Sequence, residues 1–174
     1  MRLLHWLAGI VLFSFIVSLL FYLAQPEIEG LVCHFRKGST ARYDGVEIRV
    51  PVTDEFMVDD TGIYLQLGGG RLSSWARGNG VGNMLIHRNK SRSGWTLEGI
   101  KAMSQRLGSK DVAEVSVDAA GLHYECVESE NHTIVDIWCI VPGNEVPFVH
   151  YFGMRRSVPE FYEILRSAAP SSIP

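Results

Sequence analysis

The first segment of this chain lacks charged side chains. Between Leu3 and Ala24 the sequence reads LLHWLAGIVLFSFIVSLLFYLA, without Asp, Glu, Lys or Arg. At a rise of about 1.5 Å per residue, a helix of this length spans about 33 Å, which covers a hydrocarbon core of about 30 Å. The sequence therefore predicts that residues 3–24 cross a membrane and that the rest of the chain is tied to it.

The segment also lacks a good signal-cleavage site, because Tyr22 and Leu23 precede Ala24 where small residues are needed. This absence favours an uncleaved anchor over a cleaved signal, and both stay open. Cys33 follows Gly-Leu-Val, which is the wrong order for lipid attachment. Arg2 precedes the span and acidic residues follow it, so the positive-inside rule leaves the N-terminus in the cytoplasm. We expect a single-pass protein of the cell inner (plasma) membrane, with its domain on the exported side.

The common catalytic motifs are missing. The chain has no G-x-S-x-G, no Gly-Lys-Ser/Thr phosphate loop and no dinucleotide fingerprint between strand and helix. The chain therefore lacks the usual sequence signs of a serine hydrolase, of a P-loop nucleoside triphosphatase and of a dinucleotide-dependent enzyme. The net charge of −3 and an exported domain also argue against nucleic acid as a partner. We expect no enzymatic activity, no catalytic residues and no cofactor.

Cysteine is scarce, with three residues in the chain. Cys126 and Cys139 fall on the apolar faces of two strands that a hairpin would place side by side. An exported location permits a disulfide between them. The alternatives are that both are buried thiols, or that Cys33 pairs with one of them.

Metal-ligand patterns are also scarce. His87, His123 and His150 lie on different predicted strands, and a zinc site would require three such ligands to converge. The spacing does not demand convergence, so solvated or internally bonded histidines are the better interpretation. We expect no metal, although a close cluster of these three residues would favour an enzyme.

Basic residues are absent from residues 111–150, which carry eight acids, whereas residues 71–110 carry eight basic residues and one acid. The two segments either neutralise each other across a sheet, which we favour, or form a two-faced molecule with a basic surface. Glycine-rich stretches between residues 68 and 82 overlap the start of the basic segment. Arg71, Trp75 and Arg77 lie there, and Trp and Arg are favoured in interfaces.

The remaining pattern indicates an α+β domain with one mostly antiparallel sheet flanked by two helices. We expect the anchor at residues 1–25 to end at Pro26, a linker at 26–30, the domain at 31–169 and a disordered tail at 170–174. Thr96 to Leu107 has a helical apolar stripe ended by Gly108, and a capping box of Ser157 and Glu160 starts the last helix. Val52 to Asp60 reads as a turn. Alternation and turn residues predict strands at 31–35, 46–50, 63–67, 83–88, 113–128 in two pieces, 133–141 and 146–154.

This order of elements resembles the PsbP/DcrB-like family of small exported α/β/α sandwiches. The early strand VEIRVP ends in a proline, a glycine (Gly121) lies at a turn of the strand meander, and the stretch VPFVHYFGMRRSVPEFYEILRSAAP is similar to the family's last strand and helix. The resemblance covers about residues 30–169, and the glycine-rich insertion at 68–82 departs from it. It implies accessory or partner-binding roles without catalysis, and it carries over no catalytic residue.

Two functions follow as expectations. The first is a non-enzymatic accessory module of the cell envelope that binds another envelope protein through Arg71, Trp75 and Arg77. The alternative is a domain that binds a small ligand or lipid in a groove beside the glycine-rich loop at 68–82. A dry apolar cavity would favour the alternative, and an exposed loop around Trp75 would favour the first.

Overall fold

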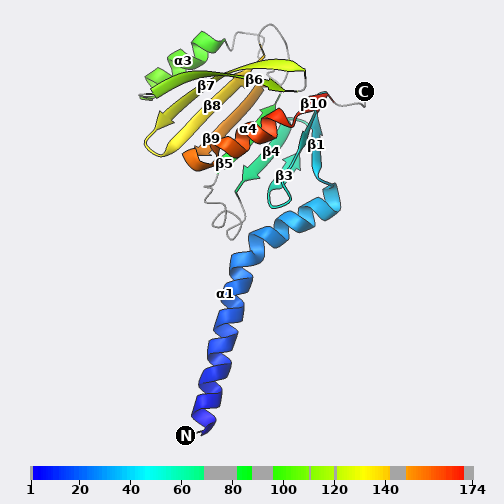
Figure 1. Cartoon of the computed structure of the whole chain (residues 1–174), viewed down its shortest axis with the longest axis vertical. Helices are drawn as coiled ribbons and strands as arrows, with labels where there is room; N and C mark the ends of the chain where they lie inside the picture. The colour runs from blue at the N-terminus through cyan, green and yellow to red at the C-terminus, as the bar shows by residue number, and fades with distance from the viewer. Residues whose placement is uncertain are drawn as a thin grey trace.

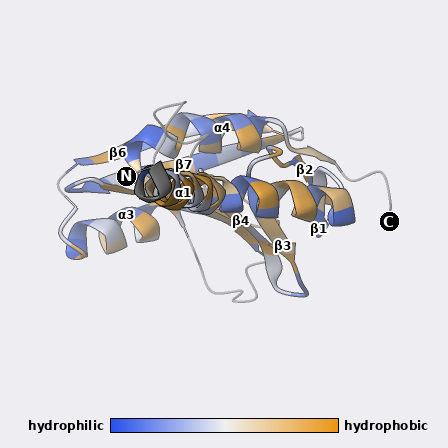
Figure 2. Ribbon diagram, turned by 90° about the horizontal axis from the view of Figure 1, so that it is seen from below, coloured by the Kyte–Doolittle hydropathy of each residue, from blue (hydrophilic) through white to orange (hydrophobic). Residues whose placement is uncertain are grey.

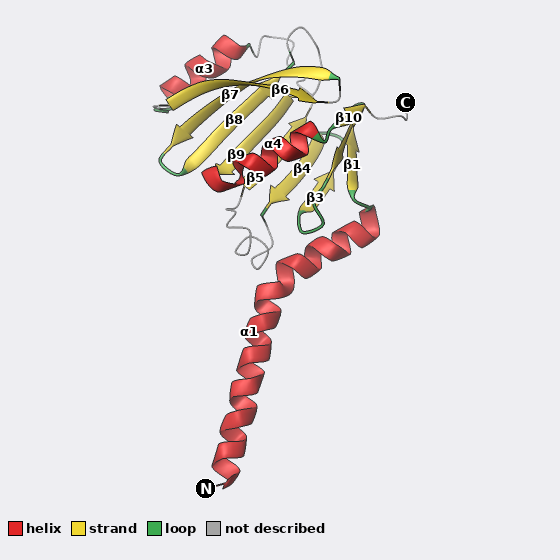
Figure 3. Cartoon of the chain, viewed as in Figure 1, coloured by secondary structure: helices red, strands yellow, loops and turns green. Residues whose placement is uncertain are grey.

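The computed structural model describes residues 2–68, 82–87, 96–109, 111–119, 121–141 and 148–170. One long helix, α1 (Arg2–Lys37), projects from a body of strands and shorter helices (Figures 1 and 3). Its segment His5–Gln25 has a mean hydropathy of 2.5 and no buried residue. The chain thus has one helix near its N-terminus that is long and apolar enough to cross a membrane, as an anchor or a signal sequence would.

The helix does not end at Pro26, contrary to the prediction. It continues through the expected linker at residues 26–30 and through residues 31–35, so the predicted strand there is wrong. The apolar run Leu31 to Phe35 has no polar alternation that would distinguish a strand from a helix. The helix bends partway along its length (Figure 1), as helices do where a proline removes a backbone donor.

The domain is built on a seven-stranded sheet in which all neighbours are antiparallel, with the order β3-β4-β5-β9-β8-β7-β6. This confirms the α+β class with a mostly antiparallel sheet. The strands are β3 (Glu55–Val58), β4 (Gly62–Leu67), β5 (Gly82–His87), β6 (Asp111–Ala119), β7 (Leu122–Asn131), β8 (Ile134–Ile140) and β9 (Phe148–Met154).

A second, three-stranded sheet has the order β1-β2-β10, where β1 is Thr40–Tyr43, β2 is Val46–Arg49 and β10 is Ala169–Pro170. The strand predicted at 46–50 is confirmed, and Val46, Ile48 and Val50 are all buried. Pro170, expected to begin a disordered tail, instead pairs with Val46. It does so at the end of a two-residue edge strand, where the missing amide of proline is tolerated.

One face of the large sheet is covered and is called the closed face here. Side chains of all its central strands form a single core with residues of the small sheet and of α4 (Val158–Arg166). Phe161, Ile164, Leu165 and Ala168 of the last helical segment are buried, as their spacing predicts. The ring of Phe161 lies 5.0 Å from that of Tyr151 on β9.

The opposite face is called the open face. Of the described helices, α3 (Leu97–Arg106) packs there against β6 and β7, on the other side of the sheet from α4 (Figure 2). Ile100 of α3 is buried, and Lys101 forms an ion pair with Glu114 of β6. This pair joins the basic and acidic segments. Apolar side chains are exposed on the part of the open face over β3, β4 and β9, namely Met57, Tyr64, Phe152 and Met154.

Local signals explain most helix ends. Thr96 caps α3 by accepting a hydrogen bond from the amide of Gly99 at 3.1 Å, and Gly108 follows the helix with a φ of +87°. The predicted capping box at Ser157 and Glu160 is wrong, because Ser157 makes no side-chain cap to α4. Ser157 lies in a short 3-10 helix, η1 (Arg155–Ser157), and its hydroxyl hydrogen-bonds Tyr151 instead.

The stretch Val52 to Asp60, predicted as a turn, contains the edge strand β3. Its acidic residues hid the alternation, because Glu55 and Met57 point to the open face and only Phe56 is buried in the core. This missed strand matters for function, since it adjoins the end of α1.

Candidate functional site

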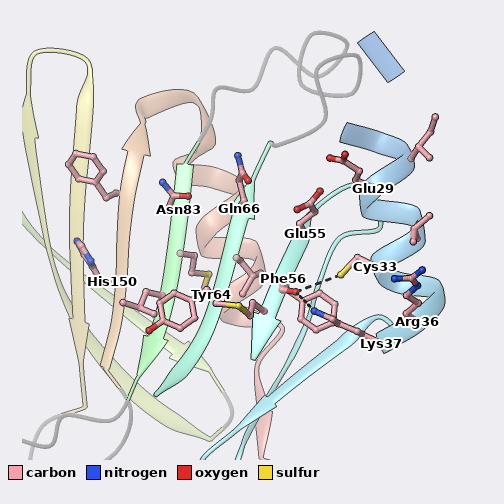
Figure 4. A pocket seen from close by; sticks show the side chains of 17 residues that line it. Glu29, Cys33, Arg36, Lys37, Glu55, Phe56, Tyr64, Gln66, Asn83 and His150 are labelled. Atoms are coloured by element: carbon pink, nitrogen blue, oxygen red, sulfur yellow. Dashed lines mark hydrogen bonds between the residues drawn. The ribbon is translucent and has the colours of Figure 1, made fainter. Parts of the chain in front are cut away.

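A groove of about 900 Å³ lies between the C-terminal turns of α1 and the open face of the sheet (Figure 4). It is bounded on one side by the helix and floored by four neighbouring strands. The lining residues are Ile28, Glu29, Val32, Cys33, Arg36 and Lys37 of α1, Glu55, Phe56 and Met57 of β3, Tyr64, Leu65 and Gln66 of β4, Asn83, Met84 and Leu85 of β5, and His150 and Phe152 of β9.

The helical wall is fixed to the edge strand β3 by side chains of α1. Cys33 Sγ and Lys37 Nζ both donate to the carbonyl of Phe56, at 3.6 and 3.2 Å. His34 Nε2 lies 3.1 Å from the carbonyl of Asp54. Edge strands have unpaired carbonyls of this kind. Side chains of α1 therefore hydrogen-bond backbone carbonyls on the edge of β3, where a further strand would otherwise bind.

Gly30 allows this close approach. A Cβ at that position would lie 3.0 Å from the carbonyl oxygen of Thr53. That separation is tight against backbone, which cannot rotate away as a side chain can. Glycine at position 30 therefore lets α1 lie directly against the turn before β3, and it sets the distance between the helix and the groove floor.

The floor is made of two cross-strand rows, as the strand register shows. The row nearer the apolar segment of α1 is polar over three strands and ends in Phe152, and its members are Glu55, Gln66, Asn83 and Phe152. The second row is mainly apolar, and its members are Met57, Tyr64, Leu85 and His150. In Figure 4, Glu29 lies beside the polar row, and Arg36 and Lys37 lie lower along the helix.

The apolar side chains of the groove are unusually exposed. Met57 is 52% exposed and Phe152 is 49% exposed. An antiparallel sheet with one solvated face normally presents polar residues there. Burying apolar surface lowers the free energy by about 25 cal/mol per Å². The groove is therefore suited to an apolar group.

An acid–imidazole pair adjoins the groove. Asp136 Oδ1 lies 2.6 Å from His150 Nε2, and the His150 ring stacks on Trp138 with centroids 3.8 Å apart. His87 lies on the same face, 3.6 Å from the ring of Phe148. Burial lowers the pKa of His87, and the neighbouring His150 lowers it further by a smaller amount.

This pair is not arranged for thiol catalysis. Cys33 is the free cysteine of the chain and lines the same groove. Figure 4 shows it on the helical wall, with β3, β4 and β5 between it and His150. A cysteine nucleophile needs its base within hydrogen-bond reach, so these two residues do not form a catalytic pair.

The structure places the other sequence-predicted residues elsewhere. Cys126 and Cys139 are cross-strand partners on β7 and β8 and form a buried disulfide. His123 pairs with Asp118 at 2.7 Å in the β6–β7 hairpin, so it does not join the other two histidines. In the described part of the chain, no group of three His, Cys, Asp or Glu residues is placed to hold a metal. Arg71, Trp75 and Arg77 lie outside the described residues.

Sequence reasoning did not identify the residues of this groove, because its wall was assigned to a strand and its edge strand to a turn. One signal was present. Met57, Tyr64, Leu85 and Phe152 occupy positions that alternate with core residues, where polar side chains are expected on a solvated face. The predicted groove beside the glycine-rich loop at 68–82 is not tested, because residues 69–81 lie outside the described residues.

Comparison with known proteins adds no family assignment. No family model matches the chain, and the curated proteins contain no significant match.

Proposed function

We propose that this chain is a single-span, membrane-anchored binding protein whose groove holds a small amphipathic molecule, without catalysing a reaction. The observation that carries the proposal is the set of exposed apolar side chains on the floor, Met57, Tyr64 and Phe152, with α1 along one side. A volume of about 900 Å³ lies within the range of small-molecule sites, which are roughly 300–1,000 Å³. Such sites combine apolar side chains with a few polar groups, and here four apolar or aromatic side chains stand beside four polar ones in the two rows.

An anchor accounts for the structure better than a cleaved signal. Helix α1 runs without interruption from the apolar segment to the residues that bind β3. Cleavage near Ala24 would remove the first part of α1, so the residues of α1 that line the groove would lie in a short helix at the new N-terminus. The Cys126–Cys139 disulfide supports an oxidising compartment for the domain, because such bonds persist outside the reducing cytosol. We therefore propose the inner (plasma) membrane, with the domain on the exported side.

The test uses the full chain in lipid nanodiscs and a water-soluble eight-carbon amphiphile carrying a diazirine. After photolysis, peptide mass spectrometry should locate adducts on β3, β4, β5 and β9. Phe152→Asp should lower their yield roughly tenfold, because it places a charge where the apolar chain lies. Met154→Asp is the matched control, since Met154 is on the same strand and also exposed but does not line the groove. Equal loss in both variants, or adducts spread over the surface, would refute the proposal.

Binding of another envelope protein through Arg71, Trp75 and Arg77 stays a prediction. It concerns residues outside the described ranges, and it is compatible with a ligand in the groove. The likeness to PsbP/DcrB-like proteins is likewise a proposal that rests on the order of elements.

A further inference from the structure

We infer that the occupant of the groove is a lipid of the bilayer itself, whose acyl chain enters from the membrane end. This inference rests on the proposed function and names the ligand class and its route. It follows from where the groove begins, what lines the path to it, and how polarity changes along the floor.

The groove begins at the membrane surface. The apolar segment of α1 ends at Gln25, and the first lining residue is Ile28. Three residues of helix correspond to about 5 Å, and the headgroup layer of one leaflet is also roughly 5–7 Å thick. The near end of the groove therefore lies at headgroup level, where lipids are by far the most concentrated amphiphiles.

An apolar path joins the span to the groove. Beyond Gln25 the helix does not become fully polar, because Ile28 and Val32 are exposed apolar residues one turn apart on the wall of the groove. An acyl chain can leave the bilayer along these residues without crossing a stretch of polar surface on the helix. Across from them, the exposed Met57 and Phe152 extend the apolar surface over the sheet.

The floor matches an amphipathic molecule better than a purely apolar one. Glu29 and the polar row of Glu55, Gln66 and Asn83 adjoin the membrane end, where a lipid headgroup remains hydrated. The row of Met57, Tyr64 and Leu85 lies beyond them, where the chain would rest. The occupant is thus expected with its head at the bilayer surface and one chain in the groove.

The experiment places the full chain in phosphatidylethanolamine/phosphatidylglycerol vesicles that contain a trace of phospholipid with a diazirine in mid-chain. After photolysis, adducts on residues of α1 up to Gln25 are expected in any case. The inference requires further adducts on β3, β4, β5 or β9. These are expected to fall roughly tenfold in Val32→Glu, which puts a charge on the path.

Phe35→Glu is the matched control. It makes the same kind of change on the same helix, at a residue that is 93% exposed and does not line the groove, so sheet adducts should change less than about twofold. Adducts confined to the span, while the soluble amphiphile still labels the groove, would overturn this inference and leave the proposed function standing. If neither the diazirine phospholipid nor the soluble amphiphile labels the strands of the groove, both this inference and the proposed function are refuted. Sheet adducts insensitive to Val32→Glu would also refute the route.

Discussion

The two faces of β9 differ although they come from one alternating strand. Tyr151 is 0% exposed on the closed face, and its neighbour Phe152 is 49% exposed on the open face. On the closed face the chain supplies its own cover, from α4 and the small sheet. On the open face over β4, β5 and β9, apolar side chains stay in water at a cost in free energy. Among the described residues, no element covers Phe152 as α4 covers Tyr151, and the proposed ligand would supply that cover.

The largest expected effect is a difference in stability between truncations on the two faces. Phe161→Ala removes a fully buried ring from the closed face and should lower the free energy of unfolding by about 3–5 kcal/mol. Phe152→Ala should lower it by less than about 1 kcal/mol, because half of that side chain is already solvated. Denaturant titration of the full chain in detergent micelles measures both. Similar losses for the two variants would mean that the faces are equally buried.

The second prediction concerns the disulfide, which lies in the core of the closed face. Replacing Cys126 and Cys139 by alanine removes a cross-link between residues 13 apart and should cost about 3 kcal/mol of stability. Denatured, unreduced protein should show one free thiol, from Cys33, and reduction should raise the count to three.

Cys33→Ala is the control for the disulfide. It leaves the bond intact and removes one weak hydrogen bond on the open side, so its effect on unfolding should be below about 1 kcal/mol. Three free thiols before reduction would contradict the pairing of Cys126 with Cys139.

The smallest expected effect is a pH dependence that comes from the open face. Burial and His150 lower the pKa of His87 below its usual 6.5. Above about pH 6.5, His87 is neutral in both the folded and the unfolded chain. As the pH falls below that value, the unfolded chain takes up the proton first, so stability is lost until the pH passes the folded-state pKa.

The measurement compares unfolding of the wild-type protein and His87→Gln between pH 7.5 and 5. The stability advantage of the wild type should shrink as the pH falls. His150, the charged neighbour of His87, is present in both proteins, so the difference between them reports on His87. A difference that is constant, or that grows as the pH falls, would contradict the assignment.

Much of the fold could be predicted because local signals were strong. Alternation placed β2, β4, β5 and β8 within a residue or two, and Gly108 and Gly121 marked real turns with positive φ. Errors arose where tertiary contacts override local pattern. Leu31 to Phe35 is helical, and in this conformation Cys33 hydrogen-bonds the carbonyl of Phe56 on the edge strand β3. Ser157 hydrogen-bonds Tyr151 rather than capping its helix.

The groove itself could not be predicted for the same reason. Its wall and its floor are far apart in the sequence, and they meet only because Gly30 lets α1 lie against the turn before β3. A sequence pattern shows which residues share a strand face, but not that a neighbouring helix leaves part of that face uncovered. Only the unusual apolar character of Met57, Tyr64, Leu85 and Phe152 pointed to a special surface.

The pairing of β10 with β2 sets an order of events during synthesis. A ribosome makes α1 and β2 long before Ala169 and Pro170 exist, so the edge of β2 has no second neighbour until the last described residues emerge. The buried residues of α4 arrive at the same late stage. The closed core therefore cannot be completed until the C-terminal residues of the chain have been made, and the apolar side chains on that face stay uncovered until then.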